Sequence, residues 1–251
     1  MNRGVRRLRL FDGRDDYELF VRYLIRALER EPIRLYAFCV MPNHFHLVVG
    51  PERDGQLAHF MKILTGSHSQ AWHRVHEAAG GGALYRGRYH ACPVQTDGHF
   101  LNVCRYVERN ALRAGLVGKA EDWPWGSAAA DRKNCDPVHL STWPILQPAD
   151  WPSILNGSES LADAAEVRRC TSRGLPLGDR DWQALAVRDL ALQSKLRGRG
   201  RPRAETEKGT DPVPFCLRDL QIQPFGELSQ PVDDLLPVGG TQQQKLLLNR
   251  R

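Results

Sequence analysis

Apolar residues recur along the first 114 residues at two different spacings, one typical of helices and the other typical of strands. We expect helices at residues 15–30, 55–76 and 97–114, and strands at residues 33–41, 44–50 and 84–94. The order helix, strand, strand, helix, strand, helix predicts an α+β fold with helices packed on an antiparallel sheet.

A complete sheet of this kind needs one more strand before the first helix. Residues 1–10 are the candidate, and they are few and rich in arginine. We therefore expect this domain, residues 1–130, to have a truncated first strand.

The chain changes character after this domain. Residues 131–203 predict a small helical segment, with helices at 160–170 and 179–192 followed by a basic arm. Residues 204–251 are rich in Pro, Gly and Gln and lack a sustained period, so we expect them to be disordered.

The net charge of +6 is unevenly distributed. Residues 204–251 contain 5 Lys or Arg and 7 Asp or Glu, which leaves the first 203 residues with 30 and 22 and a net charge of +8. Of the 35 basic residues, 29 are arginine, whose planar guanidinium suits phosphate groups and base edges. The charge therefore favours a nucleic-acid partner, although a GC-rich genome would produce the same bias without any function.

Membrane and disulfide classes are disfavoured by the composition. No apolar run approaches the roughly 20 residues that a membrane span needs, and the N-terminus lacks the apolar segment of a secretory signal. The six cysteines are scattered without a CxxC pair, which argues against a zinc ribbon and a disulfide framework. We expect a cytoplasmic protein with no membrane partner.

Two histidines stand out in the stretch "MPNHFHLVV", residues 41–49. Side chains alternate along a strand, so His44 and His46 share one face, with Cβ atoms about 6.5–7 Å apart, while Phe45 points to the other face. Two imidazoles at this spacing can bind one divalent ion. The alternative is a pair of half-buried, hydrogen-bonded histidines, because two ligands alone do not make a metal site.

The helix expected at 97–114 supplies the missing groups. At about 100° per residue, its apolar positions form one stripe and Arg105, Arg109 and Arg113 form another on the far side. Tyr106 and Asn110 lie one turn apart between these stripes. Tyr106 is a candidate nucleophile and Asn110 a candidate oxygen ligand, suited with the histidines to Mg²⁺ or Mn²⁺. The alternatives are a boundary tyrosine and an ordinary surface asparagine.

The stretch "MPNHFHLVV" followed by "CRYVERNALRAGLV", residues 104–117, resembles the single-tyrosine HUH transposases, and more narrowly the REP-associated tyrosine transposases of bacteria. The resemblance covers roughly residues 2–128 and continues loosely into the segment up to 203. It implies a ferredoxin-like antiparallel sheet with packed helices. It also implies metal-dependent cleavage and rejoining of single-stranded hairpin DNA through a 5′-phosphotyrosine at Tyr106, with His44, His46 and Asn110 holding the metal ion.

The resemblance also implies a nucleoid-associated protein that acts as a monomer rather than a dimer. One alternative is a decayed or repurposed transposase that binds hairpin DNA without cutting it. Another, less favoured, is a replication or conjugation initiator with the same chemistry.

DNA contacts are expected where aromatic and basic residues interleave. Tyr85, Arg86 and Arg88 lie in "LYRGRYH", a pattern that suits base stacking and phosphate binding. An ordinary strand with packed aromatics and solvated arginines explains the same pattern. Arg105 and Arg109 lie beside the candidate nucleophile. Arg199 and Arg201 lie in "RGRP", a short string similar to minor-groove binding arms.

Overall fold

We describe the protein from a computed structural model that covers residues 1–78, 80–95, 98–129 and 138–196. The elements in chain order are β1 (Asn2–Arg3), η1 (Val5–Arg7), α1 (Arg14–Arg30), β2 (Arg34–Met41), β3 (His44–Gly50), α2 (Gln56–Val75), α3 (Gly98–Glu108), α4 (Asn110–Arg113), η2 (Ala120–Asp122), α5 (Trp151–Asn156), α6 (Leu161–Arg173), α7 (Arg180–Asp189) and α8 (Gln193–Leu196). The predicted α+β fold is confirmed. The predicted tail, 204–251, lies outside the described residues.

The sheet has three antiparallel strands in the order β1-β3-β2. Both strands expected at its centre are present, and β3 begins at His44 as predicted. A register shift between Leu35 and Ala37 marks a bulge in β2, after which Cys39 pairs with His46. This pairing places the histidine strand in the middle of the sheet, between β1 and β2.

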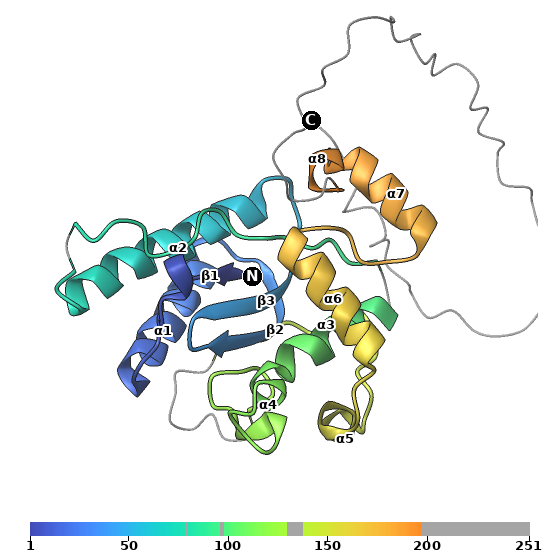
Figure 1. Ribbon diagram of the computed structural model, residues 1–251, viewed down its shortest axis with the longest axis horizontal. Helices are drawn as coiled ribbons and strands as arrows, with labels where there is room; N and C mark the ends of the chain where they lie inside the picture. The colour runs from blue at the N-terminus through green and yellow to red at the C-terminus, as the bar shows by residue number, and fades with distance from the viewer. Residues whose placement is uncertain (79, 96–97, 130–137, 197–251) are drawn as a thin grey trace, which may run out of the picture. The chain divides into compact units, whose positions relative to one another are not determined.

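Each face of the sheet is covered by different helices (Figure 1). On one face α1 and α2 bury an apolar core that includes Phe20, Leu24, Phe60, Leu64, Phe38, Val40 and Phe45. On the other face α3 packs on Ala37, Cys39, Met41 and Val48. Phe45 is fully buried against Phe20, with ring centroids 4.7 Å apart. The strand's alternation therefore directs His44 and His46 to the α3 face, as expected.

The strand expected at 84–94 does not form as a regular strand, and that expectation was wrong. Only Tyr85 pairs beside β1, through an antiparallel bridge to Gly4, the residue after that strand, and the N–H of Arg86 donates to the carbonyl of Arg3 at 2.8 Å. Two causes are visible: β1 offers only two residues for pairing, and Gly87 adopts a left-handed φ of 69° that turns the chain away. Residues 84–86 nevertheless follow the free edge of β1, where a fourth strand of a ferredoxin-like sheet lies.

The helix expected at 97–114 is divided into α3 and α4, with the break at Arg109. The break follows Glu108, whose buried carboxylate accepts hydrogen bonds from the hydroxyl of Ser127 and, at 2.7 Å, from the indole N–H of Trp151. Gly115 ends the helical segment with a φ of 69°, as predicted. Asp97, the expected N-cap, lies outside the described residues.

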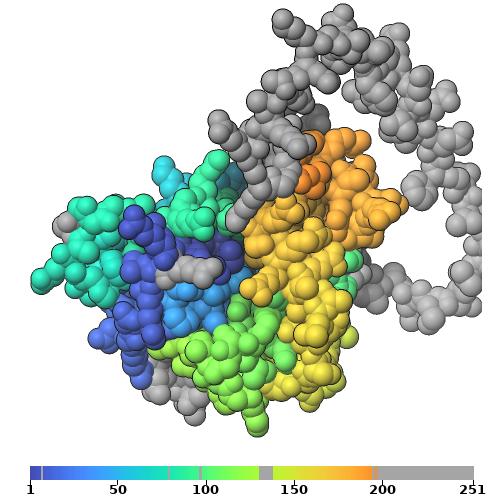
Figure 2. Space-filling model, in the orientation of Figure 1, coloured from blue at the N-terminus to red at the C-terminus, as the bar shows by residue number. Residues whose placement is uncertain are grey.

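The C-terminal helices share a core with the α3 face of the sheet. The predicted helices at 160–170 and 179–192 appear as α6 and α7, whereas α5 was not predicted. Buried residues of this region pack into the same cluster as α3, among them Trp151, Leu155, Val167, Cys170 and Leu177. Figure 2 shows the surface of α5 and α6, in yellow, directly against the green surface that includes α3. Across the described ranges, no helix combines the length and apolar character needed to cross a membrane.

Candidate active site

Strand β3 places His44 and His46 side by side on the α3 face of the sheet. Their ring centroids are 5.1 Å apart and their planes are nearly perpendicular. His46 is only 4% exposed and His44 is half-buried. Nδ1 of His44 lies 2.7 Å from Oδ1 of Asn43. If Nδ1 donates to that oxygen, Nε2 keeps its lone pair for a metal ion, which is the usual role of such a neighbouring acceptor.

Both imidazoles are held neutral by their surroundings. Burial, together with the positive charges of Arg3 and the N-terminus, lowers the pKa of His44 to about 4. Burial lowers the pKa of His46 well below its ordinary value, and the charges of His44, the N-terminus and Arg113 add to this effect. A neutral imidazole is the form that binds a metal ion, so the pair is prepared for coordination at neutral pH.

Helix α3 brings Tyr106 to the histidines. The rings of Tyr106 and His46 lie 5.9 Å apart, edge to face, and Tyr106 is 9% exposed. The position follows from the helical stripe, because Cys104 and Val107 on either side of Tyr106 are buried against the sheet. Within the described residues, the Tyr106 hydroxyl has no hydrogen-bond partner. Its phenolic oxygen is therefore free to act on a substrate.

Asn110 begins α4, one helical turn after Tyr106. Its side-chain Nδ2 is buried without a hydrogen-bond partner among the described residues. A buried amide N–H normally has an acceptor, so this orphaned donor fits a site that gains an acceptor, such as an oxygen ligand of a bound ion, while the amide oxygen is the atom that can bind the ion itself. The described residues contain no cluster of three or more His, Cys, Asp or Glu that could hold a metal ion. An ion bound by the two histidines therefore needs donors of another kind, such as the Asn110 amide.

The predicted DNA contacts divide into three groups in the structure. Arg86 and Arg88 are exposed, as a phosphate contact requires. Tyr85 is buried, with its hydroxyl 2.7 Å from Nδ1 of His68 and its ring edge-on to Phe45. The base-stacking role predicted for Tyr85 is corrected accordingly: its ring is part of the core in this structure. Arg199 and Arg201 lie outside the described residues.

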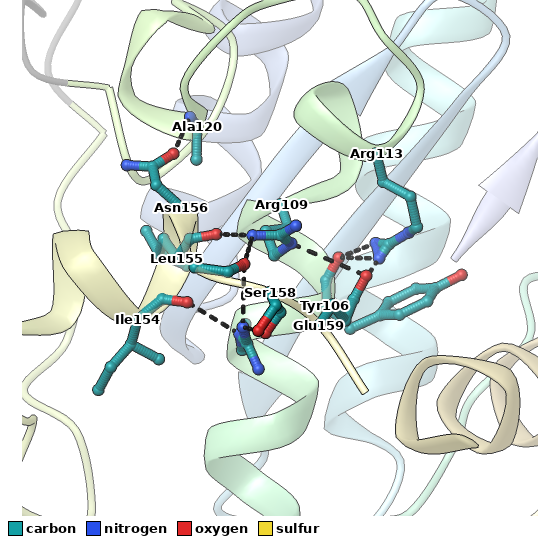
Figure 3. A network of polar contacts seen from close by, with 11 residues as sticks. Tyr106, Arg109, Arg113, Ala120, Ile154, Leu155, Asn156, Ser158 and Glu159 are labelled. Carbon is teal, nitrogen blue, oxygen red and sulfur yellow. Dashed lines mark hydrogen bonds and ion pairs between the residues drawn. The ribbon is translucent and has the colours of Figure 1, made fainter. Parts of the chain in front are cut away.

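Arg105 and Arg109 bind the end of α5, and Figure 3 shows Arg109 beside Leu155. Arg105 donates to the carbonyls of Ile154 at 3.0 Å and Ser158 at 2.6 Å. Arg109 donates to the carbonyls of Leu155 and Gly157. A helix ends with unpaired carbonyl groups, and basic side chains commonly satisfy them. In this structure the two arginines hold α5 against α3, a function that their spacing alone did not indicate.

The sequence indicated no role for two residues that lie near Tyr106. Arg113 was recognised only as part of the basic stripe, and Glu159 was not singled out at all. Glu159 lies in the connection between α5 and α6, and it is 53 positions from Tyr106 in the sequence. No periodic pattern joins residues in a connecting loop to a helix so far away, so only the folded chain shows the contact.

The fold and the site define an α+β protein in which a His-X-His strand faces a tyrosine on the adjacent helix. A family model described as "Transposase IS200 like" matches residues 3–110, so this part of the chain is similar to that family. The match includes the two histidines, the tyrosine and Asn110.

Comparison with solved structures found similarity to a REP-associated tyrosine transposase bound to a REP hairpin. The two sequences are 18% identical, and the alignment covers 57% of this chain and 85% of the other, with a TM-score of 0.37. The search of curated proteins found no match.

Proposed function

We propose that this protein is a tyrosine transposase that cuts and rejoins single-stranded DNA next to a hairpin. The observation that carries the proposal is the meeting of His46 and Tyr106 across the interface of β3 and α3. The part of the chain that forms this site matches a transposase family model. The solved relative is bound to a REP hairpin, and we extend that class of substrate to this protein.

In the proposed reaction Tyr106 is the nucleophile. Its phenolic oxygen forms a bond to the phosphorus, and the bond between phosphorus and the 3′ oxygen breaks. The phenol proton passes to water, and the leaving 3′ oxygen takes up a proton. The products are a 5′-phosphotyrosine and a free 3′-hydroxyl, and rejoining is the same step in reverse. No nucleotide hydrolysis is needed, because the bond energy stays in the phosphotyrosine.

His44, His46 and Asn110 would hold the divalent ion, Mg²⁺ or Mn²⁺. When bound, such an ion polarises the scissile phosphate. The protein's own contribution is to keep both imidazoles neutral by burial and to fix the ring of His44 through Asn43. The exposed Arg86 and Arg88 are proposed to bind phosphates of the DNA strand.

We infer that the protein acts as a monomer on chromosomal DNA in the cytoplasm, with Arg199 and Arg201 as further contacts. The test is a labelled hairpin oligonucleotide incubated with the protein and Mn²⁺. A covalent protein–DNA adduct is expected on a denaturing gel. The Tyr106→Phe variant should bind the same DNA and give no adduct, and an adduct with that variant would overturn the assignment.

A second candidate is a hairpin-binding protein without cleavage. It is favoured by the short β1 and by the irregular chain beside it, because this edge of the sheet lacks two full strands. This candidate predicts the same DNA affinity for the protein and for Tyr106→Phe, with no adduct from either.

A further inference from the structure

The guanidinium group of Arg113 covers one face of the Tyr106 ring. Its Cζ atom lies 3.9 Å from the ring centroid. The same group donates to the main-chain carbonyl of Tyr106, from Nη2 at 2.5 Å and from Nη1 at 3.3 Å. Arg113 therefore contacts both the ring and the backbone of the proposed nucleophile.

Arg113 is itself fixed by a carboxylate. Its Nη1 lies 3.4 Å from Oε1 of Glu159, and Nε of Arg109 lies 3.7 Å from Oε2 of the same side chain. Glu159 is 13% exposed, so water screens this ion pair less than it screens a pair on the open surface. Figure 3 shows Arg109 and Arg113 converging on Glu159, with the Tyr106 ring beyond Arg113.

Glu159 reaches this position because α5 is held in place. Arg105 and Arg109 bind the carbonyls at its C-terminal end, and Trp151 at its start donates to the buried Glu108 of α3. The connection that follows α5 therefore starts from a fixed point beside α3, and it brings Glu159 to Arg113.

We propose that Arg113 is a positioning residue for Tyr106 and that Glu159 keeps Arg113 in place. A cation over an aromatic face is attracted to the ring, and the carbonyl contacts fix the distance between the guanidinium and the tyrosine backbone. Together they restrict rotation of the ring and keep it beside His46. A nucleophile loses rate steeply when it is displaced from the attack geometry, so this restriction acts on the chemical step.

The inference rests on the proposed function. It extends the proposed site to residues beyond the part of the chain that matches the family model. Residues 3–110 match the family model, whereas Arg113 and Glu159 both lie beyond that match. The segment after the family match therefore supplies the residues that hold the proposed nucleophile in position.

The variants Arg113→Gln, Arg113→Lys and Glu159→Gln test the proposal. Matched controls are Arg22→Gln, an exposed arginine on α1, and Glu166→Gln, an exposed glutamate on α6. The single-turnover rate of adduct formation at saturating hairpin DNA should fall by about 10-fold to 100-fold in Arg113→Gln. It should fall less in Glu159→Gln and Arg113→Lys, and it should not change in the controls. DNA affinity and melting temperature should stay near those of the unaltered protein.

A second measurement does not depend on cleavage. Protein labelled with 3-fluorotyrosine gives a ¹⁹F resonance for Tyr106, assigned by its loss in Tyr106→Phe. Arg113→Gln and Glu159→Gln should both shift this resonance, and the double variant should shift it no further than Arg113→Gln alone. An unmoved resonance, or an unchanged rate in an active protein, would overturn the positioning role. A shifted resonance in a protein that forms no adduct would instead support the positioning and refute the proposed cleavage.

Discussion

His46 and Tyr106 belong to two elements that are 60 residues apart in sequence, and their rings meet edge to face at 5.9 Å. The strand contributes a neutral imidazole and the helix a phenol. An adjacent buried residue fixes the orientation of each element. Phe45 does so for the strand that carries His46, and Val107 does so for the helix that carries Tyr106. The site thus arises where α3 crosses the middle strand of the sheet.

Metal binding should depend on both histidines and on the residue that orients one of them. His46→Ala should abolish Mn²⁺ binding measured by calorimetry. Asn43→Ala should weaken it by about 10-fold to 100-fold, because Asn43 sets the ring orientation of His44 without being a ligand. The exposed His139→Ala serves as the control and should bind like the unaltered protein. Equal affinity in His46→Ala would contradict the proposed ligand set.

The free energy of unfolding should fall when the pH is lowered from about 6.5 towards 4. Burial lowers the pKa of His44 and of His68 to about 4, from an ordinary value of 6.5. In this window the unfolded chain binds protons that the folded chain does not, so stability is full above pH 6.5 and is lost as the pH falls. Between pH 6.5 and 5 each histidine should contribute a loss of about 2 kcal/mol.

Urea unfolding at several pH values measures this loss. His68 is fully buried in the core, with its Nδ1 bonded to Tyr85, so His68→Gln should reduce the pH dependence. If the free energy of unfolding depends on pH equally in His68→Gln and in the unaltered protein, His68 is not a source of the pH dependence.

Arg105 and Arg109 should matter for stability rather than for DNA affinity. Arg109→Ala removes the arginine donor of the Leu155 carbonyl and one of the two arginine donors of the Gly157 carbonyl, at a cost of about 1.5–3 kcal/mol. Thermal unfolding should therefore begin at a lower temperature, while hairpin affinity, measured well below that temperature, is retained. A variant that melts normally and loses DNA affinity would restore the role that the sequence predicted.

Arg86 and Arg88 should show the opposite behaviour. Both are exposed, so replacing them with alanine should leave the melting temperature unchanged. Hairpin affinity should fall, and the slope of its logarithm against the logarithm of salt concentration should decrease by about 0.7–0.9 per lost phosphate contact. Binding titrations at several salt concentrations measure both quantities. An unaltered slope would exclude these two residues from the DNA surface.

Local patterns predicted much of the fold because they follow from backbone geometry. The alternation in β3 correctly assigned Phe45 to one face and the histidines to the other, and the apolar stripe of residues 100–114 correctly predicted which side of the helix is buried. The chain at 84–94 was misjudged because a strand also needs a partner, and β1 provides only two residues.

At the site, the sequence could not predict the contacts between residues that are far apart along the chain. His44, His46, Tyr106 and Asn110 could be proposed as site residues from the sequence because two short motifs carry them. Arg113 and Glu159 were not assigned a role, since their contacts depend on how α5 is tethered to α3. The aromatic pattern around Tyr85 was ambiguous for a similar reason. The sequence is the same whether the tyrosine faces DNA or, as in this structure, bonds to the buried His68.

The central claim is that Tyr106 becomes covalently joined to the 5′ phosphate of cut DNA. It is tested most directly by forming the adduct with hairpin DNA and Mn²⁺, digesting the protein and the DNA, and locating the remaining nucleotide by mass spectrometry. We predict a phosphonucleotide on the peptide that contains Tyr106 and on no other tyrosine peptide. A nucleotide attached to a different residue, or cleaved DNA with no attached peptide, would contradict the account.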